Sequence, residues 1–285
     1  MVTAMKVTSR QIEDAVVAMH RAGRLLLEGQ DQVPWTLKDD NTFVTSLDLQ
    51  VEDTLGSVLR NIFPDCTFIG EEDPASWSLT YDPRPKIVLD PIDGTAPFVR
   101  GLNYFGISLA VVEGRGRPLL AIIHLPGLRK WCVASFEDLK PTMYQVAFQG
   151  DTPRVAVIEG RHPGLRDWSV EHCYIYVGSD AHRQLNLSAY EGKVRALGAT
   201  AAHLALLTDN TTDPAAVVLS RYKIWDVVAG LALASAAGLD IRNLTSGAAF
   251  HFEELFGHSK LWPVLLVGPS DVLNALADSV RVREG

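Results

Sequence analysis

Cysteine, long apolar runs and basic clusters are all scarce in this sequence. The 285 residues contain only Cys66, Cys132 and Cys173, which stand far apart without a Cys-x-x-Cys pair, so neither a disulfide framework nor a zinc finger is expected. No apolar run approaches the length of about 18 residues that marks a membrane-spanning helix, and no apolar segment of a signal peptide follows the first residues. We therefore expect a soluble protein in a reducing cytoplasm, with no membrane partner.

Basic residues are fewer than acidic ones and are scattered along the chain. Lys and Arg together number 26 against 34 Asp and Glu, for a formal net charge of −8. Because a nucleic-acid-binding surface needs clustered positive charge, no nucleic-acid partner is expected. The hydrophobic content of 47% and the length of the chain are instead typical of a globular protein with a large core.

The first half of the chain has the pattern of two amphipathic helices followed by short strands. Apolar residues at helical spacing predict helices over residues 8–27 and 46–62. Asp48 and Glu52 fall on the side of the second helix opposite its apolar stripe. Strand-like segments bounded by Gly and Pro turns follow at 67–69, 87–89, 105–112, 119–124, 130–135 and 143–148. These patterns predict an antiparallel sheet packed by two helices.

After about Gly150 the pattern changes to an alternation of strands and helices, which is typical of an α/β fold. Strands are expected at 174–177, 194–197, 216–219 and 264–267. Helices are expected at 180–190, 201–207, 226–237 and from Ser270. The fold class is therefore predicted as α+β followed by α/β, with a metal-binding subdomain at 1–150 and a subdomain at 151–285 that completes the active site.

The most informative stretch is Asp90-Pro91-Ile92-Asp93-Gly94-Thr95, which follows an apolar strand. Pro91 stiffens the chain so that the two carboxylates can converge, and Gly94 allows the backbone to approach a ligand closely. Carboxylate oxygens are hard ligands that suit Mg²⁺. Such a turn can also serve only as a solvated or helix-capping turn, because Asp, Pro and Gly are common in turns.

Two further acids stand at the ends of predicted elements. Glu71 follows the strand at 67–69, and Asp226 opens a helix rich in small residues, where it could also act as an N-cap. Four carboxylates would repel a phosphate dianion, and the overall negative charge gives no long-range attraction. Only bound divalent cations would make such a pocket attractive to an anion.

Taken together, these motifs resemble those of the inositol monophosphatase family. They occur in the family's order and at similar separations: Lys38, Val44-Thr45-x-x-Asp48-x-x-x-Glu52, Gly70-Glu71-Glu72, Asp90–Thr95 and Trp225–Gly230. The resemblance implies a layered αβαβα sandwich, a Mg²⁺-dependent phosphomonoesterase, a homodimer and sensitivity to lithium.

The resemblance also assigns roles to individual residues. Two or three Mg²⁺ ions are expected, with Asp90 bridging two of them, on the ligands Glu71, Asp90, the Ile92 carbonyl, Asp93 and Asp226. Asp48 and Thr95 are expected to orient the attacking water, while Glu71 holds the metal ion that activates it. The residues implied in substrate binding are Asp93, Gly94, Thr95, Thr200, Leu219 and Asp226.

The sequence departs from the family pattern where the alcohol half of the substrate is recognised. Leu219 stands where inositol phosphatases usually carry an acid, and Thr200 carries a hydroxyl one position later than usual, where it could instead be a helix N-cap. We expect direct attack by water on a small phosphate ester, inositol 1-phosphate or a related polyol or sugar phosphate. Histidinol phosphate is the rival substrate, and a non-catalytic regulatory binding protein is the alternative of another class.

Overall fold

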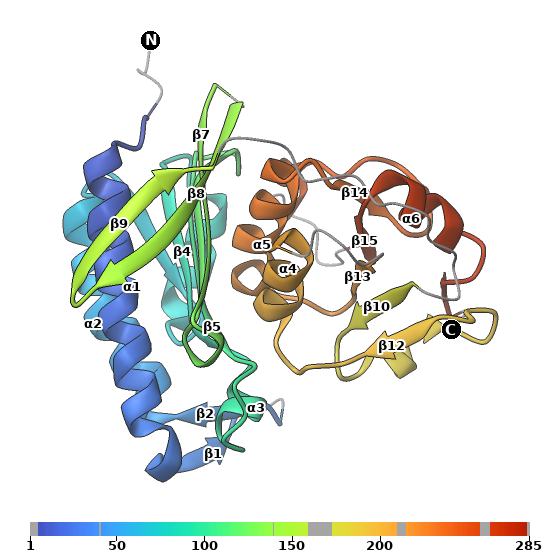
Figure 1. Ribbon diagram of the computed structural model, residues 1–285, viewed down its shortest axis with the longest axis horizontal. Coiled ribbons are helices and arrows are strands. Elements are labelled where there is room, and N and C mark those ends of the chain that lie inside the picture. Colours follow the sequence, from blue (N-terminus) through green and yellow to red (C-terminus); the bar gives the residue numbers. More distant parts are fainter. Residues whose placement is uncertain are drawn as a thin grey trace.

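The protein is a layered αβαβα sandwich in the computed structural model, which describes residues 5–39, 41–138, 140–158, 173–209, 215–256 and 263–283. Figure 1 shows the layers in order: α1 and α2, the larger sheet, α4 and α5, the smaller sheet, and α6. This order confirms the predicted fold class. None of the helices in these ranges is both long and apolar enough to cross a membrane.

The outer helices are α1 (Ser9–Gly29) and α2 (Ser46–Ile62), as the apolar spacing predicts. Each begins with a capping box. The side chain of a threonine just before the helix accepts a hydrogen bond from the backbone N–H of the third helical residue, and the side chain of that residue accepts one from the backbone N–H of the threonine. These threonines are Thr8 and Thr45. The apolar stripes of both helices are buried against the larger sheet.

The larger sheet has seven strands in sequence order, β3 to β9, and all neighbouring pairs are antiparallel except β3 with β4. The antiparallel meander is therefore confirmed, whereas β9 and a hairpin of β1 and β2 lie outside the predicted strands. The bounds are β1 (Trp35–Leu37), β2 (Phe43–Thr45), β3 (Thr67–Gly70), β4 (Lys86–Asp93), β5 (Gly106–Val112), β6 (Pro118–Leu125), β7 (Lys130–Glu137), β8 (Lys140–Gln149) and β9 (Thr152–Val157).

The smaller sheet has the strand order β12-β10-β13-β15-β14, with α4 and α5 on one face and α6 on the other. The alternation of strands and helices is confirmed. The bounds are β10 (Tyr174–Val177), β12 (Lys193–Arg195), α4 (Thr200–Asp209), β13 (Ala215–Leu219), α5 (Ile224–Ala236), β14 (Asp240–Asn243), β15 (Leu265–Gly268) and α6 (Ser270–Leu276).

Helices α4 and α5 are buried between the two sheets and form one core with both of them. They pack closely because Gly230 has no side chain: a Cβ atom there would lie 2.3 Å from the Leu204 side chain. The division into 1–150 and 151–285 stays a proposal, and β9 continues the first sheet beyond Gly150.

The predicted helix at 180–190 is wrong. The chain instead forms a short 3₁₀ turn (Ala181–Arg183) and the strand β11 (Leu185–Asn186), which pairs with β16 (Arg281–Val282). The Asn186 side chain accepts a hydrogen bond from the Ser188 N–H. Such local side-chain bonds compete with helical hydrogen bonds, which explains why helical spacing alone misleads here.

Two expectations about acidic residues also need correction. Asp48 and Glu52, expected on the polar side of α2, are buried, with 1% and 7% exposure, because this part of α2 faces β3 and the segment that follows it. Asp226 is not the first residue of its helix, since α5 begins at Ile224 and Asp226 occupies the third position.

The contribution of His124 to stability should fall in mild acid because its ring is buried in the neutral form. Burial lowers its pKa from 6.5 to about 3, so between these values the unfolded chain binds a proton that the folded chain does not. The contribution of His124 to the free energy of unfolding should therefore decrease below pH 6.5, by up to about 2 kcal/mol at pH 5, whereas the buried carboxyls of Glu52 and Asp93, whose pKa burial raises to about 7, contribute in the opposite direction. Urea unfolding at pH 7.5 and pH 5 measures the slope of the free energy of unfolding against pH.

The variants His124→Asn and His182→Asn separate this effect from general acid sensitivity. His182 is exposed, so its loss should leave the pH slope unchanged, whereas His124→Asn should reduce the slope even if the variant is less stable overall. Equal slopes in the wild type and His124→Asn would contradict the prediction.

Candidate active site

The end of β4 carries the acidic motif. All four residues Asp90, Pro91, Ile92 and Asp93 are buried, and the pairing with β5 changes register between the two aspartates. The Ile92 N–H donates to Asp90 Oδ1 at 3.0 Å. The motif is thus an irregular strand end followed by a short helix, α3 (Thr95–Phe98), so the predicted strand and helix start are confirmed, whereas the predicted acidic turn between them is wrong because both aspartates lie on the strand.

Gly94 joins this strand to α3 with a φ of 86°, in the left-handed region that favours glycine. A Cβ atom at this position would lie 2.6 Å from the Ala199 side chain. The close approach of the two segments therefore depends on glycine, and it brings the start of α4 next to the acidic strand end.

Four carboxylates from three elements are gathered at this point. Because β3 and β4 are parallel neighbours, Glu71 emerges beside β4 at the same edge as Asp90 and Asp93, and α5 adds Asp226. Burial raises the pKa of Asp90, and repulsion from the other three carboxylates raises it further. Burial likewise raises the pKa of Asp226, and Glu71 and Asp93 add to the shift. The predicted carboxylate ligands thus form one electrostatically coupled cluster.

The donor chemistry of the cluster fits hard divalent cations, since it consists of carboxyl groups whose charged forms repel one another and would be stabilised by a bound cation. Within the described ranges, however, no three His, Cys, Asp or Glu side chains already stand together as a ligand set for one ion. Other hydrogen bonds hold these carboxylates: Lys38 donates to Glu71 at 2.9 Å, and the Lys223 N–H donates to Asp226 at 2.7 Å.

Asp93 ties the acidic strand end to α4. Its Oδ1 atom accepts a hydrogen bond from the Thr200 N–H at 3.0 Å, and its Oδ2 atom accepts one from the Ala201 N–H at 2.8 Å. Burial raises the pKa of Asp93 to about 7, although these N–H donors lower it. The helix begins at Thr200, so the suggestion that the Thr200 side chain is its N-cap is wrong, and Asp93 satisfies the first N–H groups instead.

Asp48 and Thr95, separated by 47 residues in sequence, are in contact: the Thr95 hydroxyl lies 3.2 Å from Asp48 Oδ1. The other oxygen of Asp48 accepts hydrogen bonds from the N–H and hydroxyl of Thr45, at 2.7 and 2.6 Å. The capping box of α2 therefore fixes Asp48 so that one oxygen faces Thr95. Thr45 was not predicted to do this, although the Thr-x-x-Asp spacing is a capping-box signal.

Leu219 lies at the end of β13 and is 4% exposed. Together with Ala215 and Val217 it belongs to the core around α4 and α5, whereas Ala216 and Val218 belong to the core around α6. Leu219 thus faces the layer that contains Asp226. Its contact with a substrate stays a prediction.

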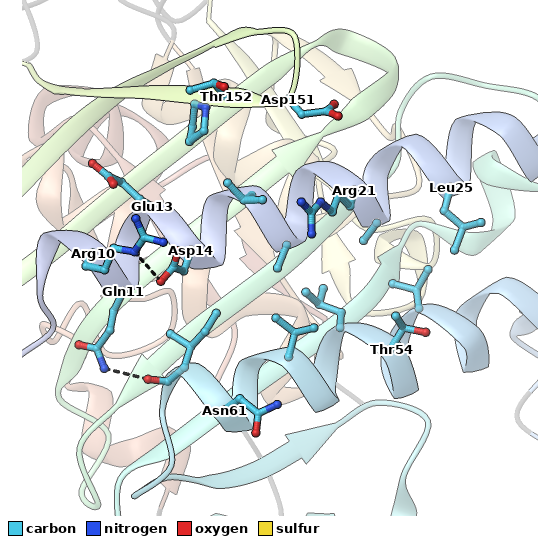
Figure 2. Close-up of a pocket in the computed structure, with 18 residues that line it drawn as sticks. Arg10, Gln11, Glu13, Asp14, Arg21, Leu25, Thr54, Asn61, Asp151 and Thr152 are labelled. Carbon is cyan, nitrogen blue, oxygen red and sulfur yellow. Dashed lines mark hydrogen bonds and ion pairs between the residues drawn. The ribbon is translucent and has the colours of Figure 1, made fainter.

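A groove of about 1030 Å³ lies apart from this cluster, between α1, α2 and the β8–β9 turn (Figure 2). It is lined by no predicted site residue, and its polar groups interact with one another: Arg10 pairs with Asp14 at 3.0 Å, and Gln11 donates to the Ile62 carbonyl at 2.9 Å. The chemistry of the protein therefore concentrates at the carboxylate cluster and not in this cavity.

The fold and the carboxylate cluster beside a Thr–Asp pair define a metal-dependent phosphoric monoester hydrolase. The chain belongs to the inositol monophosphatase family, whose model matches residues 10–266.

Curated relatives and solved structures agree with this membership. The Nus factor SuhB of Pasteurella multocida is 35% identical over 115 residues, which cover 39% of this chain and 42% of that protein. The 3'(2'),5'-bisphosphate nucleotidase CysQ of Salmonella typhimurium is 24% identical over 82% of this chain and 87% of that protein. The crystal structure of the extragenic suppressor protein suhB from Bartonella henselae has a TM-score of 0.72 at 21% identity, covering 95% of this chain and 98% of that one. This last likeness shows the shared fold.

Asp90→Asn should abolish most activity while leaving the metal-free fold intact. The amide can still accept the Ile92 N–H bond, and its neutrality relieves repulsion inside the buried cluster. We expect kcat to fall by about 10²-fold or more, since a lost metal ligand removes several kcal/mol of transition-state stabilisation. The melting temperature in EDTA should stay level or rise.

Phosphate release at saturating Mg²⁺ and thermal unfolding in EDTA are the two measurements. Asp53→Asn, the same change at an exposed position of α2, serves as the control. Near-normal turnover of Asp90→Asn would show that Asp90 is not a metal ligand.

Proposed function

We propose that the protein hydrolyses a small phosphate monoester, inositol 1-phosphate or a related polyol or sugar phosphate, with Mg²⁺ and by direct attack of water. The observation that carries this proposal is the Thr95–Asp48 contact of 3.2 Å beside the carboxylate cluster. A hydroxyl held in this way by a fixed carboxylate can hold a water molecule in place for attack, and it does so next to oxygen ligands for metal ions.

Asp48 and Thr95 together would orient that water. Thr45 binds one Asp48 oxygen, so the other is directed at Thr95. The Thr95 hydroxyl also lies 3.1 Å from the Ile92 carbonyl oxygen, and whichever of the two oxygens accepts its proton, an oxygen lone pair of Thr95 remains to accept a hydrogen bond from water. The pair thereby sets the direction from which water approaches the phosphate.

Glu71, Asp90, the Ile92 carbonyl, Asp93 and Asp226 would hold two or three Mg²⁺ ions. Bound there, the ions would offset the charge of the cluster and of the phosphate and lower the pKa of the attacking water. The similar structure of an IMPase/NADP phosphatase complexed with Mg²⁺ and phosphate supports this choice of ion. Gly94, which has no side chain, and the start of α3 would leave backbone N–H groups accessible to the phosphate.

The alcohol half of the substrate would meet a wall formed by Leu219 and the start of α4 at Thr200. The orientation of Leu219 toward the α4 and α5 layer supports this placement. The Leu219 side of this wall is apolar and offers no hydrogen bond to a sugar hydroxyl, so it selects mainly by size, with about 1–3 kcal/mol of preference. Histidinol phosphate therefore remains a rival substrate.

We also propose sensitivity to lithium at millimolar concentrations, a homodimer and a cytoplasmic location, as the family resemblance implies. A small monovalent ion can replace one Mg²⁺ among carboxylates without supplying its full charge. All three cysteines lie within the described residues and none forms a disulfide, which is compatible with a reducing compartment.

The test of the function is a comparison of substrates. With Mg²⁺, we expect kcat/KM for inositol 1-phosphate to exceed those for histidinol phosphate and glycerol 2-phosphate by less than about 100-fold, because an apolar wall discriminates weakly. A bisphosphate nucleotide belongs in the panel because a relative is named for that activity. A preference of about 100-fold or more would mean that another residue recognises the inositol hydroxyls. No hydrolysis of any ester would overturn the proposed function.

Thr95→Ala should lower kcat by about 10²-fold, a usual size for the loss of a group that positions a proton donor or acceptor in the reaction. Thr95→Ser keeps the hydroxyl and should retain most of the activity. Steady-state kinetics at saturating Mg²⁺ measure both. An unchanged kcat in Thr95→Ala would reduce Thr95 to a structural residue at the start of α3.

A further inference from the structure

Trp77 contacts Gly70 and Trp225, which come from opposite halves of the chain. Each of these two residues directly precedes a proposed metal ligand. It lies in the 3₁₀ helix η2 (Pro74–Tyr81), directly after β3. Its indole N–H donates to the Gly70 carbonyl at 2.9 Å, and its ring centroid lies 5.1 Å from that of Trp225. Gly70 precedes Glu71 and Trp225 precedes Asp226 in the chain, so a single side chain connects both ligand-bearing segments.

On the β3 side, η2 takes the place of a neighbouring strand. Among the described residues β3 is an edge strand paired with β4 alone, and beyond it the Glu71 N–H donates to the Leu89 carbonyl. The backbone groups of Gly70 are bound by the side chains of η2: the Gly70 N–H donates to Ser76 Oγ at 3.2 Å, and the Gly70 carbonyl accepts from Trp77. The backbone just before Glu71 is therefore held by side-chain hydrogen bonds where no strand is available.

On the α5 side, Trp225 is held between two layers. Its carbonyl accepts a hydrogen bond from the Ser108 hydroxyl of β5 at 3.1 Å, and its ring is 7% exposed beneath Trp77. Ser108 lies opposite Asp90 in the pairing of β5 with β4. The start of α5 is thus fixed against the strand that carries Asp90 on one side and against η2 on the other.

We propose that Trp77 is a positioning residue that sets the separation of Glu71 and Asp226 and thereby the affinity of the cluster for a divalent cation. This inference rests on the proposed metal site. The carboxylates repel one another, so without a connection of this kind the edge strand and the helix start could move apart. Trp77 opposes that movement without touching the ion or the substrate.

The test separates metal affinity from catalysis. Calorimetric titration of the substrate-free protein with Mg²⁺ should give a dissociation constant about 10-fold or more higher in Trp77→Ala, a size typical of lost support around metal ligands. Trp77→Phe keeps a ring against Trp225 but loses the hydrogen bond to Gly70. Its Mg²⁺ dissociation constant should therefore lie between those of the wild type and Trp77→Ala. At saturating Mg²⁺, kcat of both variants should change much less than the dissociation constant.

Trp131→Ala is the matched control. It removes an indole that stacks on His124 at 3.7 Å within the core formed with α1, so it should cost stability without changing the Mg²⁺ dissociation constant. If Trp77→Ala does not fold, the Trp77→Phe comparison carries the test alone.

The outcomes distinguish the two proposals. Wild-type Mg²⁺ affinity in the Trp77 variants, or an equal loss in Trp131→Ala, overturns the positioning role and leaves the phosphatase function standing. Weakened Mg²⁺ binding in the Trp77 variants alone supports the positioning role. If the wild-type protein binds Mg²⁺ but hydrolyses no ester, the proposed function fails while the calorimetric comparison still decides the role of Trp77.

Discussion

The hydrogen bonds between the Asp93 carboxylate and the first N–H groups of α4 connect the two halves of the molecule at the site. Asp93 ends a strand of the larger sheet, and α4 begins the helical layer between the sheets. Burial and neighbouring carboxylates disfavour the charge on Asp93, whereas the helix N-terminus favours it. A helix from the other half therefore stabilises the charged form of Asp93 at the end of the strand.

The packing of the two halves follows from this junction. Helix α4 can start beside Asp93 only because Gly94 leaves room for Ala199, and α5 can lie close to α4 only because Gly230 leaves room for Leu204. These two close approaches bring Asp226 to the same point as Glu71 and Asp90. The carboxylate cluster thus depends on the close approach of these backbone segments as well as on the acidic residues themselves.

Local patterns predicted most of the fold because burial follows periodicity. Helix α2 begins and ends where the apolar spacing and Pro64 indicate, and the buried strands β5 and β6 are mostly apolar, as is the Ile87–Leu89 part of β4. The exception near Asn186 arises from a side-chain bond that periodicity does not register. Strand β9 is mostly exposed, with Pro153 and Val155 half-buried and none of its side chains fully buried, and it is absent from the prediction.

The sequence by itself determined the order of the motifs, the positions of the acids in the chain and most of the helix and strand types, because each depends on residues that are neighbours in the chain. Only the tertiary structure decided that Asp48 and Glu52 are buried, that Thr95 meets Asp48 across 47 residues, and that Trp77 lies against Trp225. The reason is physical: whether a charged or aromatic side chain is buried depends on which distant segment packs over it, and a local pattern holds no information about that segment.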